Sequence, residues 1–247
     1  MITYKIKVAG IVIKIEAQFH RMWNICQPYL VDDSTEPDFT VHCCEADLDH
    51  EATIYESHYR HSAPSDVYLE EYAMLRLVAD RLINYNTLTV HGSAIGAAHD
   101  GFVFLAPSGI GKTTHVKKWL NRCDSAFVIN GDKPFLSFCE NEATPPLICA
   151  SPWAGKENMY TNTMVPLKSI ILMERAENNH IEKISFAEAF PSLLQQVYRS
   201  ADEQKMRKTL HLMQRLSPTV TFWRFQCNNF KDDCFDVAYN ALVRNQP

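Results

Sequence analysis

The sequence predicts an α/β protein in which a small β-rich region precedes a larger domain. Its first residues alternate between apolar and polar side chains, as half-buried strands do. After about residue 86, short apolar segments alternate with helical patterns, and one such segment leads through a glycine-containing loop into a helix. We therefore expect a β-rich N-terminal region with a capping helix at residues 1–85, and a second domain at residues 86–247.

The composition is that of a globular protein and argues against two classes of partner. Of the 247 residues, 46% are hydrophobic and 21% are charged. Lysine and arginine number 24 against 29 acidic residues, a net charge of −5, so we expect no broad basic surface and no nucleic-acid partner. The apolar stretches, such as 170–173, are far shorter than the roughly 20 residues of a membrane-spanning helix. No membrane partner is expected.

The N-terminus and the cysteines predict a cytoplasmic location. Lys5, Lys7 and Lys14 interrupt the apolar positions of the first strands, which excludes a signal-peptide core. The eight cysteines extend from Cys26 to Cys234 without a Cys-x-x-Cys pair. We expect reduced, mostly buried thiols and no structural metal ion.

The N-terminal region is predicted to begin with a β-hairpin. Apolar side chains alternate on both sides of a turn at Ala9 and Gly10. Residues 39–44 form another short strand, and residues 66–83 carry a broad apolar stripe that is typical of a helix.

The second region contains strands and helices in alternation. Strands are predicted at 87–91, 102–105, 126–130, 135–139, 167–174, 181–184 and 220–226. Helices are predicted at 111–120, 186–198, 201–216 and 231–243. Ser185 and Glu188 fit a capping box before the second of these helices. The short apolar segment 126–130 is typical of a strand that is buried on both faces.

Glycine usage indicates where the functional site lies. Seven of the eight glycines fall between Gly92 and Gly155, and glycine permits sharp turns and close approach to a ligand. Within this segment, strand 102–105 is followed by Pro107-Ser-Gly-Ile-Gly-Lys-Thr-Thr114 and then by a helix. That order is typical of a P-loop, whose amides and helix N-terminus bind phosphate.

The predicted P-loop assigns a role to each of its residues. The nucleotide-binding residues are Ser108, Gly109, Ile110, Gly111, Lys112, Thr113 and Thr114. Lys112 would contact the β- and γ-phosphates of ATP, and the Thr113 hydroxyl would bind Mg²⁺. The pattern departs from the full P-loop signature at its first position, where Ala106 replaces glycine.

Phosphoryl transfer also needs a carboxylate, and Asp132 is the candidate. It follows the apolar strand 126–130, and ligands of open α/β sheets bind at the carboxyl ends of strands. Asp132 would bind the metal or accept a proton from the attacking hydroxyl. The sequence Asn130-Gly131-Asp132 is also good turn chemistry, and the two interpretations are compatible.

The segment from His91-Gly-Ser-Ala-Ile95 through SGIGKTT to Asp132 resembles the HPr kinase/phosphorylase and phosphoenolpyruvate-carboxykinase-like P-loop kinases. The similarity is greatest to their short relatives, which include kinases of lasso-peptide gene clusters, and it covers residues 67–243. The resemblance implies an α/β core of that family's type and transfer of phosphate from ATP to a serine hydroxyl. It also implies roles for Lys112, Thr113, Asp132 and His91, the last as an acid/base, phosphate-binding or aspartate-orienting group.

In one position the chain departs from the family's pair of aspartates. Gly131 stands in place of the first aspartate, so either Asp132 acts alone or another carboxylate, such as Glu174 or Glu157, completes the site. The chain also lacks the long N-terminal domain of HPr kinases, so HPr is not assigned as the substrate.

A second loop, 151–158, could close over the phosphates. It carries Trp153, Gly155 and Lys156, and the short relatives have a similar Pro-Trp-x-Gly-Lys segment. Lys156 would add positive charge, while Trp153 would either exclude water or anchor the loop to the core. Arg175 and Arg199 are further candidates for phosphate or acceptor contacts.

The sequence thus predicts a cytoplasmic Mg²⁺/ATP-dependent kinase that acts on a hydroxyl, most simply a serine of a peptide or protein. The alternatives are a nucleotide-sensing interaction protein without phosphoryl transfer and a small-molecule kinase. A GTPase is not expected, since no guanine-reading Asn/Thr-Lys-x-Asp segment follows the P-loop.

Overall fold

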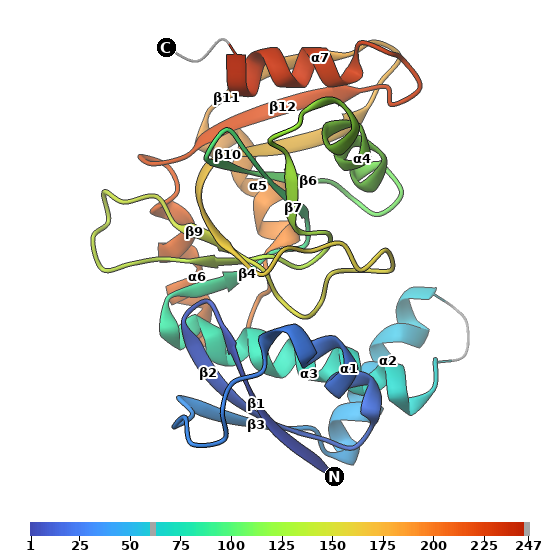
Figure 1. Cartoon of the computed structure of the whole chain (residues 1–247), viewed down its shortest axis with the longest axis vertical. Coiled ribbons are helices and arrows are strands. Elements are labelled where there is room, and N and C mark those ends of the chain that lie inside the picture. Colours follow the sequence, from blue (N-terminus) through green and yellow to red (C-terminus); the bar gives the residue numbers. More distant parts are fainter. Residues whose placement is uncertain (60–62, 245–247) are drawn as a thin grey trace. The chain divides into compact units, whose positions relative to one another are not determined.

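The computed structural model describes residues 1–59 and 63–244, and they form two compact units, Met1–Tyr85 and Asn86–Pro247 (Figure 1). We describe each unit by itself. Among the described residues, every helix is too short or too polar to cross a lipid bilayer.

The first unit contains a three-stranded sheet in the order β1-β2-β3. Strands β1 (Ile2–Val8) and β2 (Ile11–Ala17) form the predicted antiparallel hairpin, and β3 (Phe39–His42) pairs with β2 in parallel. Ala9 and Gly10 both have positive φ values, 52° and 83°, which is the backbone conformation that a two-residue hairpin turn requires.

Helices account for more of this unit than the β-rich prediction allowed. They are α1 (His20–Cys26), the short 3₁₀ helix Gln27–Tyr29, α2 (Glu45–Tyr59), α3 (Asp66–Leu82) and the 3₁₀ helix Ile83–Tyr85. Helix α3 confirms the predicted one. Helix α2 escaped prediction because its side chains are mostly polar and exposed, and a helix without an apolar stripe leaves no period of 3.6 in the sequence.

A buried carboxylate joins α3 to the start of α1. Glu70 is fully buried, and its side chain accepts hydrogen bonds from the backbone amides of Gln18, at 2.5 Å, and Phe19, at 3.0 Å. These amides precede α1, where backbone donors lack helical acceptors. The Glu70 side chain therefore supplies the acceptors that this helix start needs.

The second unit is a mixed α/β fold around a sheet of nine strands. Its order is β4-β8-β9-β10-β6-β5-β7, with β12 also paired to β10 and β11 paired to β12. The parallel pairs are β10 with β6 and β10 with β12, and the other pairs are antiparallel. The strands are β4 (Thr87–Thr89), β5 (Ser93–Ala97), β6 (Asp100–Leu105), β7 (Phe127–Asn130), β8 (Phe135–Ser137), β9 (Leu147–Cys149), β10 (Met164–Arg175), β11 (His180–Ile184) and β12 (Thr221–Cys227).

Two of these strands were not predicted. Strands β5 and β9 are short segments next to turns, which the pattern of residues did not reveal. Strand β7 was predicted to be buried on both faces, and three of its four residues are buried, although it is the last strand in the order and pairs with β5 in antiparallel orientation. It also contacts α4, and a helix packed on a strand shields its side chains from solvent.

The helices of the second unit largely follow the sequence prediction. They are α4 (Lys112–Arg122), α5 (Phe186–Gln196), α6 (Glu203–Gln214), α7 (Cys234–Tyr239) and the π-helical segment Asn240–Arg244. The predicted capping box is confirmed at α5, where Ser185 Oγ accepts from the Glu188 amide and the Glu188 carboxylate accepts from the Ser185 amide. The helix predicted at 231–243 begins only at Cys234.

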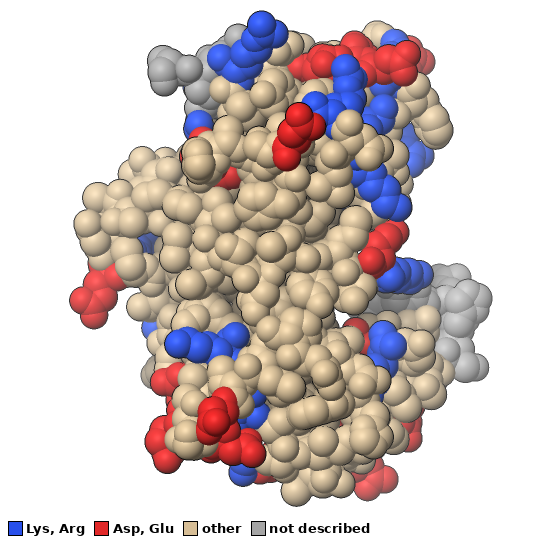
Figure 2. All heavy atoms as spheres, in the orientation of Figure 1, with Lys and Arg blue, Asp and Glu red and all other residues tan. Residues whose placement is uncertain are grey.

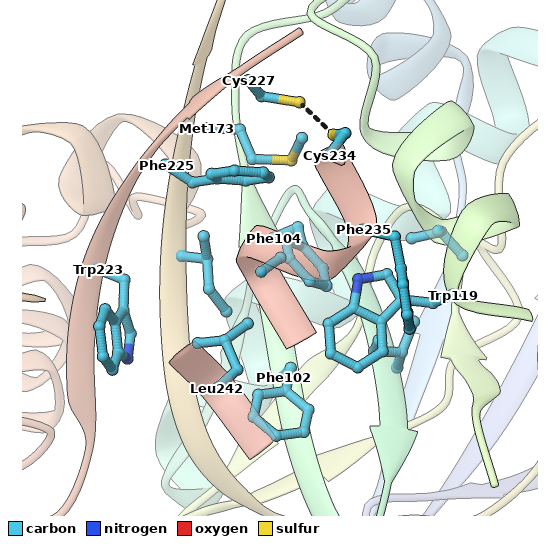
Figure 3. Close-up of a cluster of buried hydrophobic side chains, with 14 of the residues drawn as sticks. Phe102, Phe104, Trp119, Met173, Trp223, Phe225, Cys227, Cys234, Phe235 and Leu242 are labelled. Carbon is cyan, nitrogen blue, oxygen red and sulfur yellow. Dashed lines mark hydrogen bonds between the residues drawn. The ribbon is translucent and has the colours of Figure 1, made fainter. Parts of the chain in front are cut away.

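Aromatic side chains form the core between the sheet and helices α4 and α7 (Figure 3). Trp119 of α4 is fully buried, stacks on Phe102 of β6 at a centroid distance of 5.9 Å, and meets Phe235 of α7 edge-on at 5.3 Å. Such pairs add to the free energy of apolar burial. The core therefore fixes α4 against β6, and with it the loop that connects them.

Charges of both signs lie on the surface around that core. In the view of Figure 2, basic and acidic side chains lie beside one another at the end of the second unit that carries α4 and α7. All eight cysteines are free thiols, and five are buried: Cys26, Cys43, Cys149, Cys227 and Cys234. The prediction that most of the thiols are buried is confirmed.

Candidate functional site

The loop of residues 106–111, here called the glycine loop, connects β6 to α4. Gly109 and Gly111 have positive φ values of 82° and 112°, a conformation that L-residues rarely adopt. Helix α4 starts at this loop without a side-chain cap. The amides of its first turn have no acceptor within the helix, and amides and the dipole at a helix N-terminus favour the approach of an anion.

A close contact is a second reason, besides the positive φ, for glycine at position 111. A Cβ atom there would collide with the side-chain amide of Asn229, which donates a hydrogen bond to Gly111 O at 3.1 Å. At Gly109 nothing lies within 4 Å of the position a Cβ would take. The backbone conformation alone therefore requires glycine at 109, whereas conformation and contact both require it at 111.

Lys112 lies beneath the glycine loop. Its side chain is buried, and Nζ donates to Ala106 O at 2.7 Å and to Pro107 O at 3.4 Å. Burial lowers the pKa of Lys112, and the attraction of Asp132 only partly offsets it, while the nearby Lys133 lowers it further. The loop thus holds a cation that has little solvent to stabilise its charge. Thr113 is half-buried at the start of α4, and Thr114 is exposed.

A second cation contacts the loop from β10. Arg175 is the last residue of that strand, which pairs with β6 in parallel, and its Nη2 donates to Gly109 O at 2.9 Å. The structure therefore places this candidate at the glycine loop. Arg199, the other arginine considered, is exposed in the segment between α5 and α6.

Asp132 follows β7 at the same edge of the sheet as the glycine loop. Strand β5 is antiparallel to both β6 and β7, so β6 and β7 run in the same direction and their carboxyl ends share one edge. The turn after β7 is fixed by Asn130, which is fully buried. Its Oδ1 accepts from the amides of Asp132, at 2.9 Å, and Lys133, at 2.7 Å, and its Nδ2 donates to Ser151 O at 3.0 Å.

Two basic side chains contact the carboxylate of Asp132. His91 Nε2 lies 3.3 Å from Oδ1, and Lys133 Nζ lies 2.8 Å from Oδ2. Burial on its own raises the pKa of Asp132, but the hydrogen bond from His91 and the charge of Lys133 outweigh it, and the pKa falls well below its ordinary value. Asp132 therefore remains ionised, and the histidine predicted from the sequence lies in contact with it.

The loop 151–158 packs against Asp132 through Gly155, and Trp153 does not shield the carboxylate. Gly155 has a φ of 79°, and a Cβ at this position would lie 3.0 Å from Asp132 Cβ. Trp153 is buried and packs beside Phe135 at a centroid distance of 6.4 Å. Of the two predicted roles for Trp153, the geometry favours anchoring to the core. Lys156 is exposed at the tip of the loop.

Gly131 leaves no room for the carboxylate that the family pattern would place there. A Cβ at this position would lie 2.7 Å from Ala154 O, and the Gly131 amide donates to Met159 O at 2.9 Å. Of the two substitutes considered, Glu174 is exposed and pairs with Arg224 at 3.7 Å. Glu157 is exposed in the loop 151–158.

Three features of the second unit escaped sequence reasoning. Lys133 and Asn130 stand next to Asp132 in the sequence, but nothing in the pattern indicates that one pairs with the carboxylate and the other fixes the turn. The structure also brings together His115, Cys227 and Cys234, whose ligand atoms lie within 4.8 Å of one another. A spacing of seven residues between the cysteines gave no signal, since the histidine is more than 100 positions away.

Comparison with known proteins yields a distant structural relation. No protein-family model matches the chain, and neither does any curated protein. Among solved structures, the Hpr(Ser) kinase/phosphatase from Coxiella burnetii is similar, with a TM-score of 0.34 and 13% sequence identity. The match covers 64% of this chain and 88% of that one.

Proposed function

We propose that this protein is a Mg²⁺/ATP-dependent kinase that transfers a phosphoryl group to a hydroxyl, with the glycine loop acting as a P-loop. One observation carries the proposal. The glycine loop, with the buried Lys112 at the uncapped start of α4, and the Asp132 carboxylate follow strands β6 and β7, whose carboxyl ends share one edge of the sheet. A phosphate-binding loop and an ionised carboxylate at one edge of a sheet are the two parts that phosphoryl transfer needs.

The residues of the glycine loop would bind the nucleotide. The amides of residues 108–114 and the positive end of the α4 dipole would bind the phosphates, and Lys112 and Arg175 would add positive charge beside the loop. A phosphoryl group in transfer carries more negative charge than a single amide can stabilise. Several donors that converge on it, such as the loop amides, Lys112 and Arg175, would stabilise that charge together.

Mg²⁺ would be held by oxygen ligands of this site. The Thr113 hydroxyl and the Asp132 carboxylate are hard oxygen donors, the type that Mg²⁺ prefers. Because the pKa of Asp132 is lowered, its carboxylate need not lose a proton when the ion binds. The ion supplies charge neutralisation for the phosphates of ATP.

The lowered pKa of Asp132 bears on its chemical role. A carboxylate that is stabilised by His91 and Lys133 is a weaker base than an ordinary one. It is therefore better suited to orient a hydroxyl and to bind a metal ion than to remove a proton in advance of transfer. His91, at 3.3 Å from the carboxylate, holds it in place.

The proposed acceptor is a serine of a peptide or protein, which is the acceptor that the family resemblance implies. The exposed Lys156, on the loop that packs against Asp132, would add positive charge next to the transferred group. A small molecule with a hydroxyl is the other class of acceptor to be tested.

The experiment compares the wild type with Asp132→Asn. Calorimetry measures binding of ATP in the presence of Mg²⁺, and γ-labelled ATP measures transfer to serine-containing peptides and to small hydroxyl compounds. We expect the variant to retain nucleotide binding within a fewfold and to lose transfer. Normal transfer by Asp132→Asn would contradict the mechanism, and absence of nucleotide binding by the wild type would contradict the whole proposal.

One observation favours a second candidate, a nucleotide sensor that transfers no phosphate. Lys133 already pairs with Asp132 at 2.8 Å, and the position of the family's other aspartate is closed by Ala154 O. In a sensor this ion pair would simply fix the turn after β7. ATP binding without any mass change in acceptors, for both wild type and Asp132→Asn, would support this function.

A further inference from the structure

A buried group of sulfur and nitrogen atoms lies away from the carboxylate site, between α4, α7 and the end of β12. Cys227 is the last residue of β12, Cys234 is the first residue of α7, and their sulfur atoms are 3.3 Å apart (Figure 3). His115 of α4 completes the group, with Nδ1 3.5 Å from Cys234 Sγ. All three residues are buried.

Hydrogen bonding fixes the protonation of His115. Its Nε2 lies 2.9 Å from Trp119 Nε1, and an indole N–H can only donate. Nε2 is therefore the acceptor, so the proton of the neutral ring is on Nδ1 and points to Cys234 Sγ. The histidine acts as a donor to this sulfur.

Cys234 Sγ thus receives hydrogen bonds from two sides. Cys227 lies 3.3 Å away with its S–H, and His115 Nδ1–H approaches from α4, while Asn229 Oδ1, at 3.4 Å, can accept the thiol proton of Cys234. The hydrogen bond with Cys227 and the contact with His115 lower the pKa of Cys234, and the same bond raises the pKa of Cys227. One sulfur is prepared as a nucleophile and the other as its proton-bearing partner.

The same geometry disfavours a metal ion. A metal would have to bind Nδ1, because the indole N–H occupies Nε2. An imidazole that binds a metal through Nδ1 carries its proton on Nε2, which would place two donors opposite each other at 2.9 Å. The three side chains therefore match a hydrogen-bonded thiol pair better than a zinc site.

We propose that Cys227 and Cys234 are a site of reversible oxidation, at which hydrogen peroxide converts the two thiols into a disulfide. The Cys234 sulfur attacks a peroxide oxygen, the O–O bond breaks, and a sulfenic acid and one water form. The Cys227 sulfur then displaces the hydroxyl group, the S–O bond breaks, and the S–S bond forms with release of a second water. Two thiols and one hydrogen peroxide give one disulfide and two waters, so the sulfurs lose the two electrons that the peroxide gains.

The movement that this reaction needs is small. The sulfur atoms are 3.3 Å apart, and a disulfide has a length of about 2.05 Å. The ring that closes spans residues 227–234 and contains Asn229, whose Nδ2 donates to Gly111 O at 3.1 Å. The oxidised site would thus lie in the segment that contacts the glycine loop, whatever ligand that loop binds.

The test uses the full chain with Cys44, Cys123 and Cys139, the cysteines that are not buried, replaced by serine. After treatment with hydrogen peroxide, remaining thiols are alkylated in denaturant and the protein is digested with trypsin. Cleavage after Lys231 separates the two cysteines into peptides 225–231 and 232–244. We expect these peptides to be linked, with a mass about 2 Da below their sum and loss of the link on reduction.

Matched variants distinguish this site from general oxidation. Cys149 is equally buried, but burial raises its pKa to about 12, so Cys149→Ser should leave the link intact. In Cys227→Ser, Cys234 has no partner thiol and should be trapped as a sulfenic acid by dimedone.

Two results would overturn the proposal. One is alkylation of Cys227 and Cys234 to the same extent as Cys149 after peroxide treatment. The other is retention of one Zn²⁺ by the reduced protein in native mass spectrometry, with loss of the ion in Cys234→Ser, because the group would then be a metal site. Neither measurement involves nucleotide, so both are independent of the proposed kinase activity.

Discussion

Lys133 Nζ lies 2.8 Å from Asp132 Oδ2, so the ionised carboxylate at the candidate site is paired with its own neighbour in the sequence. Two consecutive residues of an extended chain point in opposite directions. They meet here because Asn130 folds the chain after β7 into a turn and binds the amides of both residues. The ion pair is therefore a product of the turn, and together with His91 it lowers the pKa of Asp132.

Replacement of Lys133 should raise the pKa of Asp132. In Lys133→Gln the carboxylate loses a positive neighbour, so its pKa should move up toward the ordinary value of about 3.9. The measurement is a ¹³C NMR titration of the Asp132 carboxyl group. As a control, Lys7→Gln changes an exposed lysine of β1 and should leave the titration unchanged. An unaltered Asp132 titration in Lys133→Gln would contradict the structure.

The same substitution predicts a pH dependence of stability. A folded-state pKa below the unfolded value stabilises the protein above about pH 4, and this stabilisation is lost as the pH falls through the folded-state pKa. Because Asp132 and Lys133 are partly exposed, Lys133→Gln should lower the free energy of unfolding by less than about 1 kcal/mol at pH 7. The difference from wild type should narrow below about pH 4. Urea denaturation across this range measures it, and a widening gap would have the wrong sign.

Substitution of alanine for each of the two loop glycines should distinguish the cost of backbone strain from the cost of the lost Asn229 contact. Gly109→Ala adds only an unfavourable φ, so we expect a loss of about 1 kcal/mol in the free energy of unfolding. Gly111→Ala also displaces Asn229 from Gly111 O, so we expect a larger loss of about 2–3 kcal/mol. Urea denaturation of both variants checks the order. Equal effects would mean that the Asn229 contact contributes nothing.

Truncation of Asn130 should be costly, because its side chain is buried and fully used. Asn130→Ala leaves the amides of Asp132 and Lys133 and the carbonyl of Ser151 without this partner, and we expect a loss of about 2–3 kcal/mol in the free energy of unfolding. Asn141→Ala is the matched control, since that side chain caps an exposed turn at Ala143 N. It should cost less than about 1 kcal/mol. A small effect at Asn130 would show that the turn forms without its side chain.

The parts of the site that the sequence predicted are those encoded locally. The glycine loop and α4 are adjacent in the chain, and Asp132 follows its strand by two residues, so composition and order sufficed to find them. The contact between Arg175 and Gly109 joins residues 66 positions apart. It depends on β10 lying beside β6, and strand order is not encoded in the pattern of apolar residues of either strand.

The fold was predictable to the same extent and for the same reason. Strands with strong apolar character and the amphipathic α3 were found, whereas polar α2 and the three-residue β9 were missed. The pairing of His115 with Cys234 spans 119 positions. Only the packing of α7 against α4 brings these residues together, and a sequence with one histidine and two cysteines so far apart gives no metal-like or disulfide-like signature.

The proposed nucleotide site makes its sharpest prediction for two lysines of α4. Lys112 is buried under the glycine loop, whereas Lys117, five residues later, is exposed on the same helix. Both substitutions to alanine remove one positive charge from the helix, so a general electrostatic effect on ATP would weaken binding equally. A charge-assisted contact to phosphate contributes about 1.5–3 kcal/mol, so Lys112→Ala should weaken binding of Mg²⁺/ATP by about 10–100-fold, while Lys117→Ala should change it less than about threefold. Calorimetry at two salt concentrations measures both, with circular dichroism to verify that each variant is folded. If the two lysines contribute equally, the nucleotide does not bind at the glycine loop.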